Sequence, residues 1–308
     1  MTVFITHPAC REHLTAPEHP ERPDRLLVIE RALEHERLMF LQREQCPIAD
    51  LDTIGLCHRP AYIERIRAAT PATGIVELDQ DTMLSPRSFE ASLRAAGGAI
   101  LAVDEVMTGK ARNAFAAIRP AGHHAGEATA MGFCLFNNAA IAARYAQRRH
   151  GAERAAIVDF DAHHGNGSQQ IFWCDRTVMY CSTHEMPLYP GTGSALERGE
   201  HDNVVNAPLR AGDGGDRFRE AFEVAILPRL HDFRPDLIVI SAGFDAHRLD
   251  PLANLNLSEA DFAWATREIM EIADVRSRGR LVSVLEGGYA LESLARSVAA
   301  HVETLMQA

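Results

Sequence analysis

The 308-residue sequence contains no uninterrupted run of about 18 apolar residues, so we expect no membrane-spanning helix. Its first residues, MTVFITHPACREH, lack a basic stretch followed by a long apolar core, and we expect no secretory signal. Positive charge is also scarce, with 31 lysines and arginines against 42 aspartates and glutamates. The resulting net charge of −11 argues against nucleic acid as the main partner.

The six cysteines are scattered along the chain and form no C-x-x-C pair. This pattern is typical of reduced, mostly structural thiols, and it favours a cytoplasmic location. Neither an internal repeat nor a linker rich in proline, glycine and serine interrupts the sequence. We therefore expect residues 1–308 to form a single domain.

Short apolar or β-branched runs alternate with longer amphipathic segments. The runs are continuously hydrophobic, which predicts strands covered on both faces, as in a mostly parallel sheet between two helical layers. The predicted strands cover residues 2–6, 114–118, 155–160, 177–182, 236–241 and 280–285. Regions 40–60 and 184–215 are punctuated by proline and glycine and are expected to form surface loops.

Three amphipathic patterns predict helices between these strands. The first stripe comprises Leu26, Leu27, Ile29 and Leu33, and the second comprises Phe218, Phe222, Ala225 and Leu230. The third segment, LSEADFAWATREIMEIA, offers Ser258 as N-cap and Asp261 at the capping-box position.

Polar residues suited to chemistry follow five of the predicted strands. They are His123 with His124, the run from Asp159 to His164, the triplet from Ser182 to His184, Asp245, and Tyr289. In open α/β sheets, ligands bind beyond the carboxyl ends of the strands. Five polar clusters at five strand ends therefore indicate one shared site.

The stretch AAIVDFDAHHGNG, residues 155–167, suggests a metal at that site. Asp161 and His163 are two residues apart, so on an extended segment they point the same way and can bind one ion. Asp245 would supply a third ligand, and an Asp/His/Asp set leaves positions open for water and substrate. Zinc is the first choice, with Fe(II) or another divalent ion as the alternative. A lone Asp-x-His is more often a capped turn, and a lone His-His is more often structural. Only their joint placement favours the metal.

The motifs RPAGHHA, GFCLFNNAAIAA, VDFDAHHGNG, YPGTG, SAGFDAH and EGGY, together with HPERPDRL at 19–26, resemble the histone deacetylase superfamily in its class II-like bacterial branch. The resemblance extends over nearly the whole chain. It implies an arginase-like three-layer α/β/α fold with a central, mostly parallel eight-stranded sheet. It also implies zinc-dependent removal of acetyl or other acyl groups from lysine or another amine.

The resemblance assigns roles residue by residue. The zinc ligands would be Asp161, His163 and Asp245. His123 and His124 match the tandem histidines, with His124 as general base and then acid, and Asp159 matches the carboxylate that supports His123. Tyr289 matches the tyrosine that polarises the substrate carbonyl, and the substrate channel would be bordered by Gly132, Phe133, Tyr189, Leu252 and Gly287.

This chain has Asn166 where many family members have a second aspartate. An amide can still orient the His124 ring, but it adds no negative charge, so His124 should lose its proton more readily.

The resemblance also implies two structural potassium sites. The first would involve Asp159, Asp161, His163, Ser182 and Thr183, and the second would involve Phe172, Asp175, Val178 and Asn203.

Three alternatives compete with a lysine deacylase. A binuclear ureohydrolase of the same fold would need ligands at Gly165 and Gly243, which glycine cannot supply. An inactive acyl-lysine-binding module should have lost one of His123, His124 and Tyr289. A deacetylase of polyamines or other small amides stays open, although an acetylpolyamine would favour a carboxylate where Leu252 stands. The preferred acyl length is not predicted, and a homo-oligomer is an open alternative.

Overall fold

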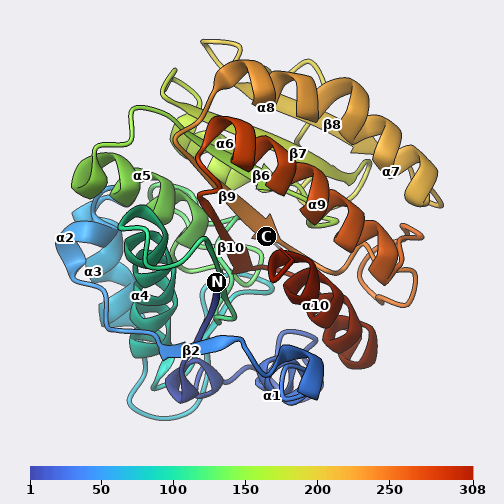
Figure 1. The fold of residues 1–308 in the computed structure, drawn as a ribbon. Coiled ribbons are helices and arrows are strands. Elements are labelled where there is room, and N and C mark those ends of the chain that lie inside the picture. The colour runs from blue at the N-terminus through green and yellow to red at the C-terminus, as the bar shows by residue number, and fades with distance from the viewer. Residues whose placement is uncertain (308) are drawn as a thin grey trace.

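A parallel sheet runs through the middle of the computed structural model, which describes residues 1–307 (Figure 1). Its eight strands lie in the order β2-β1-β5-β10-β9-β6-β7-β8, and every neighbouring pair is parallel. The strands are β1 (Thr2–Thr6), β2 (Gln42–Gln45), β5 (Asn113–Ala116), β6 (Ala155–Asp159), β7 (Val178–Glu185), β8 (Val204–Leu209), β9 (Leu237–Ala242) and β10 (Leu281–Leu285). A separate antiparallel hairpin pairs β3 (Val76–Glu77) with β4 (Met83–Leu84).

Helices cover both faces of the sheet (Figure 1). One face carries α2 (Leu51–Ile54), α3 (Pro60–Ala69), α4 (Ser88–Met107) and α5 (Asn138–His150). The other carries α1 (Asp24–Ala32), α7 (Gly215–Ala221), α8 (Leu227–Phe233), α9 (Glu259–Arg276) and α10 (Leu291–Leu305). The short helix α6 (Asn166–Phe172) follows β6, and single turns lie at η1 (Pro8–Arg11), η2 (Glu36–Leu38) and η3 (Phe222–Ile226). The predicted three-layer, arginase-like α/β/α architecture is confirmed.

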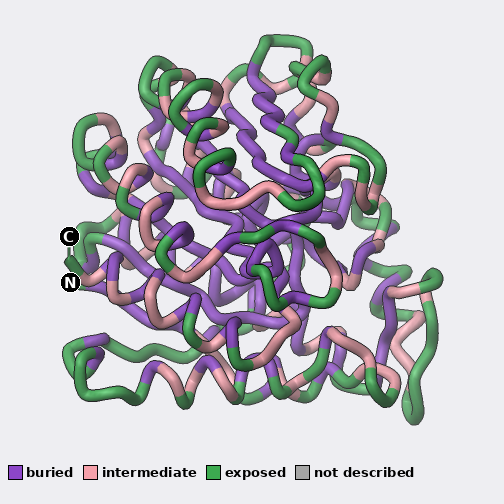
Figure 2. The backbone as a smooth tube through the Cα atoms, turned by 90° about the vertical axis from the view of Figure 1, so that its right-hand side faces the viewer, coloured by how far each residue is buried: buried purple, intermediate pink, exposed green. Residues whose placement is uncertain are grey.

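The central strands are apolar throughout because both of their faces are buried. Along β9, Leu237 and Val239 belong to the core beneath α2–α5, whereas Ile238 and Ile240 belong to the core beneath α1 and α7–α10. Successive side chains of a strand point to opposite faces, so a continuous apolar run supplies both cores at once. Figure 2 shows the resulting buried interior surrounded by exposed loops.

Two predicted loops contain strands, so the sequence-based assignment was wrong there. Region 40–60 includes β2, and region 184–215 includes β8 and the end of β7. Both β2 and β8 are edge strands of the sheet. All four residues of the β2 sequence QREQ are exposed, and β8 contains Pro208, which an edge strand tolerates. Strand β2 lacks the hydrophobic pattern that identified the central strands, and in β8 Asn206 and Pro208 interrupt that pattern.

The helical predictions fare better. Leu26, Ile29 and Leu33 are buried, but Leu27 is 44% exposed. Leu27 is rotated by about 100° from Leu26 around the helix, and on this side of the helix that rotation carries it to the solvent. At the start of α9, Ser258 and Asp261 form the predicted capping box. No helix within residues 1–307 is long and apolar enough to cross a membrane.

Candidate active site

The five polar clusters follow five strands that are neighbours in the sheet. These strands are consecutive in the sheet order: β5, β10, β9, β6 and β7. The first four are followed, in that order, by His123, Tyr289, Asp245 and Asp161, and Ser182 lies within β7. Because the strands are parallel, their carboxyl ends meet at one edge. The topology therefore brings the clusters together, as expected.

Asp161, His163 and Asp245 form a buried group whose potential ligand atoms all lie within 4.8 Å of one another. His163 Nδ1 lies 2.8 Å from Asp245 Oδ2 and 3.2 Å from Asp161 Oδ1. Two buried carboxylates this close repel each other unless a cation lies between them. The donor set and its geometry thus fit a divalent metal ion.

The pKa values of these groups reflect the same crowding. Burial and the nearby charge of Asp161 raise the pKa of Asp245 to about 7. Burial also opposes ionisation of Asp161, but the adjacent His123 and His163 hold the pKa of Asp161 below its usual range. The two carboxylates do not both ionise readily without added positive charge.

The reason for expecting Asp161 and His163 side by side was wrong, although the two side chains do meet. Strand β6 ends at Asp159, and residues 161–163 form a bend rather than an extended segment. The bend is held because the His163 backbone N–H donates to Asp161 Oδ1 over 2.9 Å. The two side chains are therefore brought together by a local hydrogen bond from backbone to side chain, not by the alternation of side chains along a strand.

Two glycines let the backbone approach the Asp161–His163–Asp245 group. A Cβ atom at Gly287 would lie 2.4 Å from Asp245 Oδ2, and one at Gly243 would lie 2.0 Å from Asp161 Oδ2. The Gly287 N–H also donates to Asp161 Oδ2 over 2.8 Å. Gly287 therefore packs directly against the two carboxylates.

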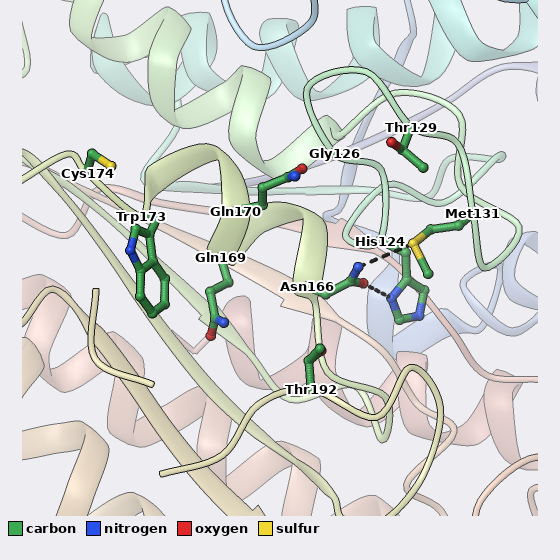
Figure 3. Close-up of a pocket in the computed structure, with 10 residues that line it drawn as sticks. All are labelled: His124, Gly126, Thr129, Met131, Asn166, Gln169, Gln170, Trp173, Cys174 and Thr192. Atoms are coloured by element: carbon green, nitrogen blue, oxygen red, sulfur yellow. Dashed lines mark hydrogen bonds between the residues drawn. The ribbon is translucent and has the colours of Figure 1, made fainter. Parts of the chain in front are cut away.

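His124 is held by Asn166, as Figure 3 shows. His124 Nδ1 lies 2.8 Å from Asn166 Oδ1, and an amide oxygen can only accept a hydrogen bond. The Nδ1 atom must therefore carry the proton, which leaves the lone pair on Nε2. Burial and the positive charges of His123 and His163 hold the pKa of His124 well below 6.5. At neutral pH the His124 imidazole is therefore neutral and can accept a proton.

His123 has the opposite character. Its Nδ1 lies 3.0 Å from Asp159 Oδ2, and its ring centre is 4.0 Å from that of His124. Burial opposes protonation, but Asp161, Asp159 and Glu286 together raise the pKa of His123 to about 10. The two adjacent histidines thus differ in their readiness to hold a proton.

Glu286 lies behind this pair and was not singled out as a site residue by the sequence analysis. Glu286 Oε2 accepts hydrogen bonds from the backbone N–H groups of Gly122 and His123, over 2.7 and 3.1 Å. Glu286, His123 and Cys134 also form a second buried group of three potential metal ligands. There, however, His123 Nδ1 and Glu286 already have hydrogen-bond partners.

A cavity of about 240 Å³ leads from the surface to His163 of the Asp161–His163–Asp245 group. Its lining comprises Asp81, His124, Gly132, Phe133, His163, Leu188, Tyr189, Leu252 and Tyr289. The rings of Phe133 and Tyr289 meet edge to face at 5.7 Å. Apart from Gly287, every predicted channel residue lines this cavity.

Gly132 and Phe133 adopt a left-handed backbone in the wall of this cavity, with φ values of 57° and 66°. A Cβ atom at Gly132 would lie 2.4 Å from His124 Cδ2, so only glycine fits beside the catalytic candidate.

Asp81 and Arg25 were missed as site residues. Asp81 lies between β3 and β4, and it reaches the cavity wall by accepting a hydrogen bond from the Gly132 N–H over 3.2 Å. No motif around Asp81 signals this contact. Arg25 belongs to the HPERPDRL stretch and is fully buried. Its guanidinium donates to the carbonyls of Glu286 and Gly288 and lies 5.0 Å from the Tyr289 ring centre, so it fixes the loop that carries Tyr289.

Some of the residues predicted for potassium binding lie next to one another. Asp159 pairs directly with Ser182 across β6 and β7. Near α6, the carbonyls of Phe172, Asp175 and Val178 converge on Asn203 Nδ2 at 2.8, 3.1 and 3.0 Å, while Asn203 Oδ1 is buried without a partner. If the Asn203 side-chain amide were flipped so that its nitrogen and oxygen exchange places, its oxygen would join the three carbonyl oxygens, and four such oxygens suit a monovalent cation.

A wider groove of about 520 Å³ reaches His124 from another side (Figure 3). Asn166, Gln169, Gln170, Trp173 and Cys174 line it along α6 and just beyond, opposite Thr129 and Met131. Within residues 1–307 all six cysteines are free thiols, and Cys174 is the exposed one.

Comparison with known proteins places this site in a family. The histone deacetylase domain matches residues 19–305. The histone deacetylase-like amidohydrolase of Pseudomonas aeruginosa is 39% identical over 291 residues, covering 93% of this chain and 75% of that protein. A probable deacetylase of Archaeoglobus fulgidus is 39% identical over 301 residues, covering 95% of this chain and 82% of that protein. The crystal structure of the HDA15 HD domain superposes with a TM-score of 0.93 at 34% identity, covering 99% of this chain and 88% of that one. The chain belongs to the histone deacetylase family of hydrolases.

Proposed function

We propose that this protein is a zinc-dependent amidohydrolase that removes acetyl or other acyl groups from the ε-amino group of lysine. One observation carries the proposal: His163, His124 and Tyr289 line the same cavity, with Asp161 and Asp245 directly against His163. A metal-binding group, a base and a phenol thus border one narrow channel. A linear acylated amine fits such a channel.

Asp161, His163 and Asp245 would hold the metal ion. When bound, zinc would polarise the amide carbonyl and lower the pKa of the attacking water. Potassium ions near Ser182 and near Asn203 would be structural, since neither residue lines the cavity.

His124 would act first as general base and then as general acid. Its Nε2 carries the lone pair because Asn166 holds the proton on Nδ1. With a pKa well below 6.5, His124 is neutral at pH 7 and can take a proton from the attacking water. The same nitrogen would then return a proton to the departing amine. Asp159 would keep His123 in place beside it.

Tyr289 would stabilise the transition state. Burial holds the pKa of Tyr289 well above 10, so its hydroxyl keeps the proton and can donate a hydrogen bond to the developing oxyanion. The Arg25 contact to its loop would keep the ring over the cavity.

Leu252 in the cavity wall favours an acylated lysine over an acetylpolyamine. A distal ammonium group gains nothing from a leucine there, whereas a carboxylate would attract it. We further propose that residues 1–308 form one catalytic domain that acts in the cytoplasm.

The test is acetate release from three acetylated substrates by purified protein: a lysine peptide, free ε-acetyl-lysine and an acetylated polyamine. We expect the peptide or free acetyl-lysine to be hydrolysed fastest, loss of activity after chelation, and recovery on adding zinc. A comparison of zinc with Fe(II) add-back identifies the better metal. Absence of acetate release from every substrate by the metal-replete protein would contradict the proposal.

A further inference from the structure

Tyr180 is a buried phenol beside the catalytic candidates, and the proposed mechanism does not use it. It lies on β7, where it pairs with Ile157 of β6, and it is fully buried. Its hydroxyl lies 3.0 Å from Asp159 Oδ2. The same carboxylate oxygen lies 3.0 Å from His123 Nδ1, so one oxygen serves both rings.

The direction of the phenol hydrogen bond follows from a third partner. The Gly165 backbone N–H points at the Tyr180 oxygen over 3.0 Å, and an N–H can only donate. The hydroxyl therefore accepts from Gly165, and its single hydrogen is free to point to Asp159.

The hydroxyl thus connects two segments of the site. Asp159 ends β6, and Gly165 closes the loop that carries His163 and His164. These atoms are closely packed, since a Cβ atom at Gly165 would lie 2.3 Å from Asp159 Oδ2 and 2.6 Å from the Tyr180 oxygen. Only glycine allows the loop to come this near.

Asp159 has no freedom to turn while all its donors are present. Its Oδ1 accepts from the Asp161 N–H over 3.1 Å, and its Oδ2 accepts from both His123 and Tyr180. Without the phenol, Oδ2 would keep only the His123 contact. The Oδ1 bond from the Asp161 N–H would remain, so the carboxylate could pivot about that bond and carry the His123 imidazole with it.

We propose that Tyr180 is a positioning residue: its hydroxyl fixes the Asp159–His123 pair and ties it to the loop that carries the metal-binding histidine. This inference rests on the proposed function, because its effect is read in deacylation. Loss of a partner behind a catalytic or metal-binding group typically costs about tenfold or more in activity. We expect that loss in kcat, with KM little changed, since Tyr180 does not line the substrate cavity.

The test is Tyr180→Phe, with Tyr145→Phe as the matched control. Tyr145 also donates to a carboxylate, Asp104, over 3.1 Å, but it lies on α5 outside the cavity lining. Both variants are assayed on acetyl-lysine and trifluoroacetyl-lysine peptides, and bound metal is measured. The wild-type protein must first hydrolyse the acetyl peptide; if it does not, the proposed function fails, independently of Tyr180.

We expect kcat of Tyr180→Phe to fall about tenfold on the acetyl peptide and less on the trifluoroacetyl peptide, whose activated carbonyl needs less catalytic help. The Tyr145→Phe control should keep wild-type values on both. The ratio of the two rates cancels the amount of active enzyme, so a poorly folding preparation still gives an answer. An equal loss on both peptides would indicate mere structural damage, and a kcat within twofold of wild type would show that the hydroxyl is dispensable. Either result overturns the proposal.

Discussion

Asn166 is the residue through which the basicity of His124 can be changed with the smallest structural perturbation. Asn166→Asp keeps the shape of the side chain and places a negative charge against His124 Nδ1, where the amide oxygen now lies at 2.8 Å. A carboxylate there favours the protonated imidazole, so the pKa of His124 should rise from its present low value.

The size of the shift can be bounded from the geometry. Two unit charges 4 Å apart attract by about 4 kcal/mol at an effective dielectric constant of about 20, and about 1.4 kcal/mol corresponds to one pKa unit. The pKa of His124 can therefore rise by at most roughly 3 pH units. Asn166 is partly exposed to solvent in the groove, and screening reduces the expected rise to about 1–2 units.

The assay is the pH dependence of kcat/KM on an acetyl-lysine peptide. Because the active form needs neutral His124, activity is lost as pH falls through the pKa of His124. In Asn166→Asp the acid limb should move to higher pH, so the variant loses activity at the acid end of the profile and keeps it at the alkaline end. Gln170→Glu is the control, since it adds the same charge to the same groove from an exposed side chain. An unmoved acid limb, or an equal shift in the control, would refute the assigned role of Asn166.

Three further predictions address the phenol, the channel and the fold. Tyr289→Phe should lower kcat by about 10²-fold or more, as removal of one oxyanion donor does, with metal retained and KM little changed; a raised KM at near-normal kcat would contradict this. Leu252→Glu should raise kcat/KM for an acetylated polyamine relative to an acetyl-lysine peptide, and an unchanged ratio would remove this position from substrate choice. Burial lowers the pKa values of His13 and His58 to about 4 and that of His301 to about 3. The unfolded chain binds these protons below about pH 6.5 and the folded chain does not, so the free energy of unfolding, measured with urea, should fall as pH drops from 6.5 towards 4. A flat dependence would contradict this.

The central strands and the place of the site were predictable because burying polar groups is costly. A strand such as AAIVD, buried on both faces and followed at once by Asp161 and His163, needs a compensating partner at its end. The five clusters could therefore be expected at one sheet edge. Their order along that edge could not, because it depends on which strands become neighbours.

The edge strands and the supporting residues escaped prediction for a different reason. Strand β2 is polar and exposed, so it lacks the burial pattern that identifies a strand. Asp81 acts through Gly132, 51 residues away, and Tyr180 acts through Asp159 on a neighbouring strand. Such contacts depend on the assembled fold. Neither residue belongs to a local motif, and a tyrosine within an apolar run is usually only part of the core.

The most direct test of the account is the metal content and deacylase activity of Asp245→Ala, measured together with those of the wild type. Asp245 offers a carboxylate 2.8 Å from His163 Nδ1, and Ala removes it from the three-ligand group. Wild-type protein should bind one zinc ion in this group, hydrolyse an acetyl-lysine peptide, and lose and regain both properties together on chelation and zinc addition. Asp245→Ala should lose both the bound zinc and the activity while remaining folded by circular dichroism. A variant that kept stoichiometric zinc, or that hydrolysed the peptide at the wild-type rate without it, would contradict the assignment of this site.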